Sequence, residues 1–220
     1  MKTQTMKLIT TNLALAAALT VLAGCASKSY DKGAATANAT SAAAAAVAQT
    51  STRVTDVLGA LNNLTFKSQG DLRKQYDAFV ATTANLDKSI ETLGAKVTAM
   101  RDAATAYSEN WSNQLNLIQG ADLRQRSTER MNEVTAKLKD MDASYLAMKS
   151  SLRPFTSDLK DIQTYLGTDL TVGGIASVKD VVAKTKVDAV PLRDSIKQLQ
   201  ASFSKLGVAL SPVLPAPDTK

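Results

Sequence analysis

The stretch that decides the fold is LDKSIETLGAKVTAMRDAATAYSENW, residues 86–111, in which mainly apolar residues recur at alternating steps of three and four. The same spacing reaches back to Leu72 and forward to Ile118. An average repeat of 3.5 residues is typical of a helix that buries one narrow seam against a partner helix. We therefore expect one long helix over residues 72–118.

A second stretch, MNEVTAKLKDMDASYLAMKSSL at residues 131–152, carries the same spacing within a longer series over residues 123–166. When the chain is folded at Gly120, seam residues of the two series pair so that their numbers always sum to 241 or 242, as for Tyr107 with Val134. A constant sum is what two antiparallel helices require. We expect an antiparallel coiled-coil hairpin with its tip at Gly120 and arms of roughly 65–70 Å.

Two shorter helices should flank the hairpin. One periodic series covers residues 175–206, and a weaker one covers residues 47–64, before a break that ends at the helix-capping residue Asp71. The sequence thus predicts an all-α fold with a three- or four-helix bundle at the base of the hairpin. The tip, from about Met100 to Met141, should be a bare two-helix coil.

The amino terminus has the pattern of a cleavable export signal. Lys2 and Lys7 precede a short apolar run, which ends in Leu-Ala-Gly-Cys at residues 22–25. This ending looks like a bacterial lipobox, so residues 1–24 should be removed and Cys25 should carry diacylglycerol and a further fatty acid such as palmitate. Several acyl chains would anchor the chain stably. The alternative is an ordinary secretory signal that a cysteine follows by chance.

Domain organisation follows from these boundaries. After the signal peptide we expect a flexible, lipid-anchored tether at 25–40, the helical bundle at 41–207 and a Pro-rich disordered tail at 208–220. Ala26, the residue after the cysteine, favours the periplasm-facing leaflet of the outer membrane under the sorting rules of enteric-type bacteria.

Composition excludes much of catalytic chemistry. The chain has no His and one Cys, which removes the usual general base and the usual zinc ligands. Loss of Lys2 and Lys7 with the signal lowers the formal charge from +6 to +4. We therefore expect no enzyme activity, no metal, no cofactor and no nucleic-acid partner.

Candidate contact residues lie near the tip. Three arginines could bind anionic groups on lipid or cell-wall surfaces, namely Arg124, Arg126 and Arg130. A solvated helix face explains these arginines as well. Trp111 and Tyr107 could touch a partner, although their seam positions favour core packing.

The function that these features favour is a non-enzymatic envelope scaffold or interaction protein. Its partners would be the membrane, through Cys25, and either a second copy or an envelope protein. A membrane-binding, curvature-shaping coiled-coil module is the alternative. Linkage of the terminal Lys220 to peptidoglycan is a further hypothesis, because a small helical outer-membrane lipoprotein is attached in that way.

Several short motifs occur together with the lipobox in a particular order. They are the Trp111 region with Leu115, then ADLRQRS at residues 121–127, the stretch from Met148 to Phe155, and YLGTDL at residues 165–170. In order and spacing they resemble the bacterial lipoprotein family called domain of unknown function 2959, over most of residues 45–207. The resemblance implies an all-helical periplasmic lipoprotein with no established activity, and it says nothing about function.

Overall fold

The computed structural model describes residues 13–66 and 70–211, with side chains from Tyr30 onward. These residues form helices and short connections without a strand, so the predicted all-α fold is confirmed. The helices are α1 (Leu13–Phe66), α2 (Leu72–Leu115), α3 (Ala121–Thr168), the short α4 (Val172–Ser177) and α5 (Lys179–Leu210).

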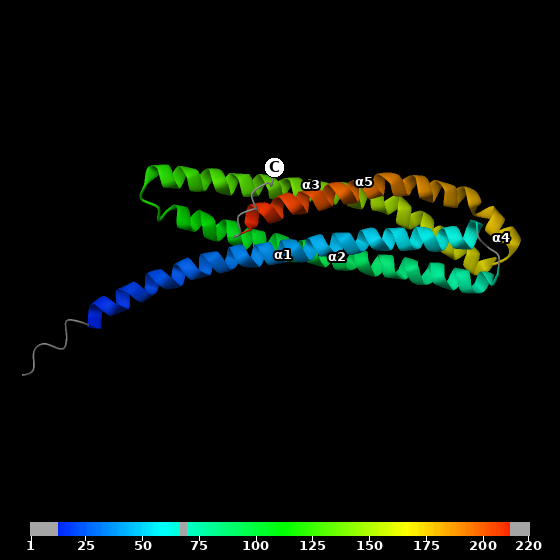
Figure 1. Cartoon of the computed structure of the whole chain (residues 1–220), viewed down its shortest axis with the longest axis horizontal. Coiled ribbons are helices and arrows are strands. Elements are labelled where there is room, and N and C mark those ends of the chain that lie inside the picture. Colours follow the sequence, from blue (N-terminus) through cyan, green and yellow to red (C-terminus); the bar gives the residue numbers. More distant parts are fainter. Residues whose placement is uncertain (1–12, 67–69, 212–220) are drawn as a thin grey trace, which may run out of the picture.

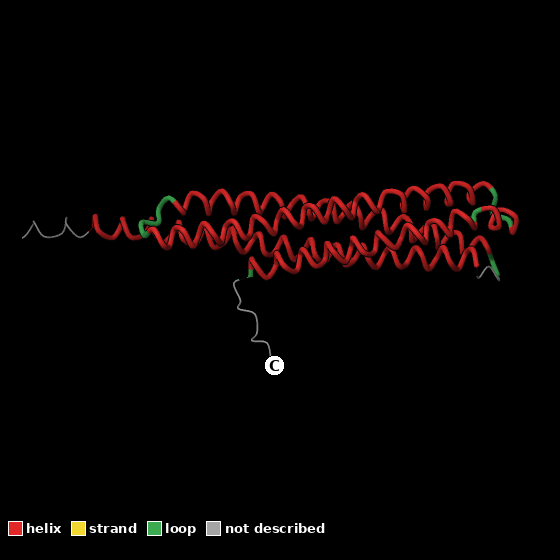
Figure 2. The backbone as a smooth tube through the Cα atoms, turned by 90° about the horizontal axis from the view of Figure 1, so that it is seen from above, coloured by secondary structure: helices red, strands yellow, loops and turns green. Residues whose placement is uncertain are grey.

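The four long helices run up and down along one rod (Figures 1 and 2). Around the rod the order is α1, α2, α3, α5, and α5 closes the ring against α1. At 44 residues, α2 alone is about 66 Å long. The ring encloses a continuous apolar core that contains seam residues from every series found in the sequence, from Val47 to Leu206. Seam positions near the tip, such as Leu123 and Met131, lie outside this core.

The predicted hairpin of α2 and α3 is present with the expected antiparallel register. Arg101 Nε donates to Asp142 Oδ1 at 2.7 Å, and the Tyr76 hydroxyl donates to the Gln163 carbonyl at 2.9 Å. The numbers in these pairs sum to 243 and 239, within a helical turn of the predicted constant.

The α1–α2 seam is the closest in the ring, because α1 offers small side chains to its neighbour. Ala43 is fully buried, and Ala46 is nearly so. The Thr36 hydroxyl lies 3.0 Å from the Ala103 carbonyl oxygen of α2, and the Thr50 hydroxyl lies 3.4 Å from the Ser89 carbonyl oxygen. Small residues let two helix axes approach, so side chains of one helix touch the backbone of the other.

The α2–α3 seam is wider, although its two helices are consecutive in the chain. Large residues such as Tyr145 and Met148 fill it. Beside them the surface is hollowed into a groove of about 370 Å³ between the two helices. The side chain of Tyr145 reaches across the seam towards Gly94, with Arg101 over its ring at 5.3 Å.

The prediction of a flexible tether at 25–40 is wrong for the part whose side chains are described. Residues 30–40 continue α1, and Thr36 and Thr40 are buried. Small polar composition suggested a linker, but Ala favours a helix and the Thr hydroxyls bond the carbonyls four residues back. α1 is therefore longer than α2 rather than a shorter flanking helix.

The predicted bare tip is also shorter than expected. α1 reaches α2 as far as Tyr107, and Arg130 of α3 bonds the Ala209 carbonyl at the end of α5. The helix α5 itself runs to Leu210, three residues beyond the predicted end of the bundle at 207. The remaining tail, 212–220, lies outside the described residues.

Local signals at the base act largely as the sequence predicts. The Asp71 carboxylate accepts from the backbone N–H groups of Arg73 and Lys74, which caps α2. Gly174 lies in α4, where a side-chain carbon would stand 2.1 Å from the Asp169 carbonyl oxygen. That close approach explains the glycine.

Candidate functional site

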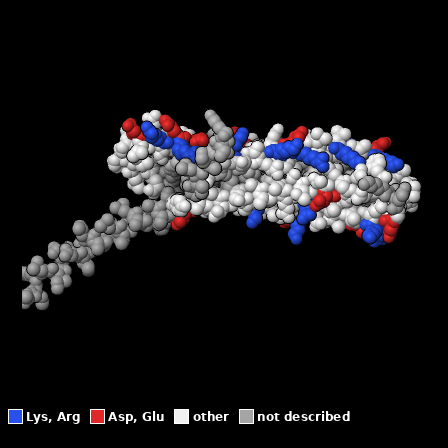
Figure 3. Space-filling model, in the orientation of Figure 1, with Lys and Arg blue, Asp and Glu red and all other residues white. Residues whose placement is uncertain are grey.

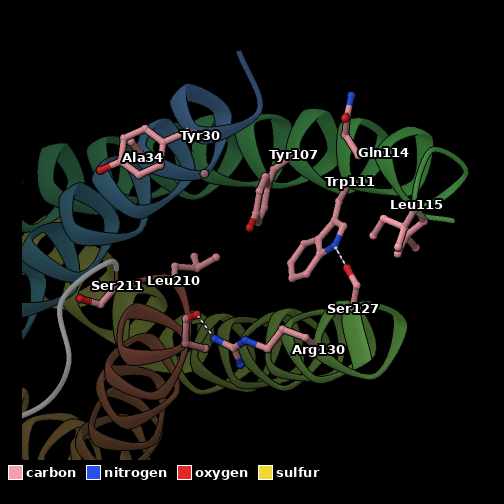
Figure 4. A pocket seen from close by; sticks show the side chains of 13 residues that line it. Tyr30, Ala34, Tyr107, Trp111, Gln114, Leu115, Ser127, Arg130, Leu210 and Ser211 are labelled. Carbon is pink, nitrogen blue, oxygen red and sulfur yellow. Dashed lines mark hydrogen bonds between the residues drawn. The ribbon is translucent and has the colours of Figure 1, made fainter. Parts of the chain in front are cut away.

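An open cavity of about 430 Å³ lies where the four long helices diverge, near the α2–α3 loop (Figure 4). Every long helix contributes to its wall. The lining includes Tyr30 of α1, Tyr107 and Trp111 of α2, Arg130 of α3 and Leu210 of α5. Among its described lining residues there is no carboxylate and no lysine, so Arg130 brings the formal charge.

Trp111 and Tyr107 form the aromatic wall of the cavity. Their ring centroids are 5.2 Å apart with planes tilted by 45°, and the indole Nε1–H donates to the Ser127 hydroxyl across the hairpin at 2.8 Å. Burial raises the pKa of the Tyr107 phenol, and the nearby Arg130 charge partly opposes this. Trp111 packs against the core with one side and lines the cavity with the other. Core packing of Trp111 is therefore confirmed in part, and contact with a partner stays a prediction.

Arg130 fixes the carboxyl end of α5 to α3. Its guanidinium donates to the Ala209 carbonyl oxygen and, at 2.6 Å, to the Glu133 carboxylate. A cation at a helix carboxyl terminus is favourable because the last carbonyls are unpaired and carry negative partial charge. The hydrogen bond from Arg130 lowers the pKa of Glu133. Much of the hydrogen-bonding capacity of Arg130 is thus used within the protein.

The other two predicted arginines lie outside the cavity. Arg124 donates through Nε and a terminal nitrogen to the Ile118 carbonyl oxygen at 2.9 and 2.6 Å, which braces the α2–α3 loop. Arg126 is exposed and has neither a hydrogen bond nor an ion pair within the described part of the chain. The three arginines therefore share one end of the rod without forming a single binding cluster.

Two exposed leucines lie at the same end. The periodic series do not include Leu117, and they place Leu123 on the buried seam, which is wrong. Leu117 is 65% exposed in the loop and Leu123 is 66% exposed at the start of α3. Between Glu109 and Asp122 the sequence contains no charged residue, and that gap is a signal which could have drawn attention to this end.

Two sequence predictions concern residues beyond this description. The Cys25 side chain and Lys220 lie outside the residues whose side chains are described. Within the described residues, no group of three or more potential metal-binding side chains occurs, and no helix is long and apolar enough to span a bilayer.

A comparison with protein families matches residues 27–206 to the family described as protein of unknown function DUF2959. The chain belongs to this family. The match includes all or part of every helix from α1 to α5, ends four residues before the end of α5 and begins two residues after Cys25. No curated protein and no solved structure matches the chain.

Proposed function

We propose that this DUF2959 protein is a lipid-anchored, non-enzymatic scaffold of the bacterial envelope, held on Cys25 in the periplasm-facing leaflet of the outer membrane. The observation that carries the proposal is the path of α1. This helix leads from the predicted lipid site directly into the packed bundle, where Thr36 and Thr40 are buried against α2. The anchor is therefore joined to the rod without a flexible spacer after Tyr30.

Two further observations support lipid anchoring. The Leu-Ala-Gly-Cys ending of the apolar run fits lipoprotein processing, and the family match starts at residue 27, directly after the expected mature amino terminus. The buried residues of the described part all lie after residue 35, so removal of residues 1–24 leaves this core intact.

The rod shape and the cavity chemistry favour a scaffold over an enzyme. The apolar core runs the length of the ring, and the cavity at its end offers aromatic rings, amide and hydroxyl groups and an arginine that is already paired. Such a surface is suited to holding a partner rather than to proton transfer, for which a group that titrates near neutral pH is needed.

The curvature-shaping alternative has less support. It calls for a long basic face, whereas acidic side chains lie among the basic ones along the face over α3 and α5 (Figure 3). Ion pairs such as Lys184 with Asp158 and Asp188 neutralise part of the positive charge there.

The anchoring is tested by metabolic labelling with a palmitate analogue in cells that express the full chain. We expect label on the wild-type protein, none on Cys25→Ser, and outer-membrane fractionation for the wild type only. Equal labelling of both proteins would refute lipid attachment at Cys25.

The scaffold role is tested by crosslinking and pull-down from intact cells. We expect either a second copy or an envelope protein to be captured specifically. Mass analysis of the same envelope fraction would show a muropeptide on Lys220 if the chain is linked to peptidoglycan. A purified chain that deforms anionic vesicles without any protein partner would favour the curvature-shaping alternative.

A further inference from the structure

We propose that the α2–α3 tip, residues 115–126, dips into the phospholipid leaflet that holds the Cys25 lipid, so that the rod stands on the membrane by this end. The inference rests on the proposed lipid anchoring. It adds an orientation of the rod and a second contact with the membrane.

The first argument is the distance from the anchor to the tip. Tyr30 lines the same cavity as Tyr107 and Trp111, and the backbone at Gly33 lies against the Tyr107 ring. Cys25 lies on α1 eight residues before Gly33, or about 12 Å along the helix. The tip projects beyond Tyr107 by ten residues up to Leu117, or about 15 Å. The lipid on Cys25 is therefore held at the height of the tip.

The second argument is the chemistry of the tip. Leu117 and Leu123 expose about two thirds of their surface, at 65% and 66%, and residues 110–121 carry no charge. Arg124 and Arg126 follow directly, at the level where phosphate groups would lie. The half-buried rings of Tyr107 and Trp111 stand behind them, in the order expected for an interfacial aromatic belt. Arg124 also holds the loop closed through the Ile118 carbonyl.

The opposite end of the rod provides a comparison. It also exposes apolar side chains, with Val172 at 80% and Phe66 at 54%. That end lies far from the anchor, since α1 runs 36 residues from Tyr30 to Phe66, or about 54 Å. Lys186 covers the Phe66 ring at 4.2 Å, and Asp169 stands next to the α4 turn. Exposed apolar residues therefore occur at both ends, but only the tip lies beside the lipid site.

Intrinsic fluorescence can test this orientation, because the chain contains one Trp. The Trp is moved from residue 111 by Trp111→Phe, combined with either Leu117→Trp at the tip or Val172→Trp at the far end. Mature protein is purified from membranes and reconstituted into phosphatidylethanolamine–phosphatidylglycerol vesicles, with or without bromine on the acyl chains. Circular dichroism checks that both variants keep their helix content.

We expect the tip variant to lose about half or more of its fluorescence in brominated vesicles and to shift to the blue, as an indole does in the membrane interface. The far-end variant should keep its intensity. In the tip variant, Leu123→Asp should reduce the quenching at least about twofold, because a charge is costly to bury in lipid.

Mass analysis of the same samples separates the two proposals. An acylated Cys25 with an unquenched tip variant refutes the tip contact and leaves the anchoring intact. A Cys25 without lipid refutes the anchoring and the inference that rests on it. Equal quenching at both ends shows a rod lying flat and overturns the orientation. A tip variant that is blue-shifted in detergent and unquenched in brominated vesicles shows that a second copy covers the tip.

Discussion

The α1–α2 seam and the α2–α3 seam are both antiparallel, yet they are built differently. Alanines and threonines let α1 lie close against α2, and the hydroxyls of Thr36 and Thr50 face the α2 backbone. Tyrosine, methionine and leucine keep α2 and α3 further apart and leave a groove beside Tyr145. Side-chain size, rather than closeness in the chain, sets which helices approach most closely.

An engineered disulfide gives the largest expected effect. The Ser144 and Ser202 hydroxyls lie 2.9 Å apart between α3 and α5. In a Cys25→Ser background, Ser144→Cys with Ser202→Cys should oxidise readily and raise the free energy of unfolding by up to about 4 kcal/mol. Val97→Cys with Tyr145→Cys, across the wide seam, should need a longer bifunctional crosslinker. Thiol titration and denaturation measure both pairs, and equal spontaneous oxidation would show that α2 and α3 lie as close together as α3 and α5 do.

Overpacking should affect the two seams unequally. Ala43→Leu places a larger side chain against α2 at a fully buried site and should cost about 1–3 kcal/mol. Ile90→Phe, beside the groove between α2 and α3, has room to expand and should change stability by less than about 0.5 kcal/mol. Urea denaturation midpoints check the pair. A larger loss for Ile90→Phe would show that the groove is closed in solution.

The ion pair between Arg101 and Asp142 should contribute little to the wide seam. Both side chains are about two-fifths exposed, so solvent screens the attraction. A double-mutant cycle with Arg101→Ala and Asp142→Ala should give a coupling of about 0.2–1 kcal/mol that falls in high salt. A coupling well above this range would mean that the pair, and not side-chain packing, holds α2 and α3 together.

Alkaline pH should weaken the wide seam slightly. Burial raises the pKa of Tyr145 above its ordinary 10.0, with Arg101 opposing the shift. A raised folded-state pKa gives stability that is present below the unfolded pKa and is lost as pH rises through the folded pKa. Denaturation midpoints from about pH 9 upwards should therefore fall less steeply for Tyr145→Phe than for the wild type. Identical pH slopes for Tyr145→Phe and the wild type would mean that the Tyr145 phenol is exposed to solvent.

The sequence predicted α2, α3 and the hairpin register correctly, because heptad spacing reports which face of each helix is buried. It underestimated the length of α1. The spacing could not show which pair of neighbouring helices lies closest together. In an up-and-down ring every neighbouring pair is antiparallel, so a constant residue sum for α2 and α3 shows a shared core rather than the closest contact. The error at 25–40 has a related cause, since Ala and Thr are typical both of linkers and of close helix packing.

The site was partly predictable. Trp111, Tyr107 and the arginines stand out by residue type, but their partners come from distant parts of the chain. Arg130 contacts Ala209, and Tyr30 lines the same cavity as the end of α2, only because α5 ends near the segment of α1 that contains Tyr30. Spacing within one helix holds no information about such contacts between distant helices. Leu117 lies off the predicted seam, so a search for buried periodicity passes over it. Leu123 begins the second periodic series, but its side chain is exposed, so spacing alone placed it wrongly.

The unbroken path of α1 has a mechanical consequence under the proposed anchoring. If a partner holds the far end near Val172, a pull between partner and membrane acts along the rod axis. The α1–α2 seam then resists in shear, with Thr36, Thr50 and the small residues between them sharing the force. A pull at right angles to the rod axis would instead separate the helices one turn at a time. The fold is thus suited to transmitting tension along its length.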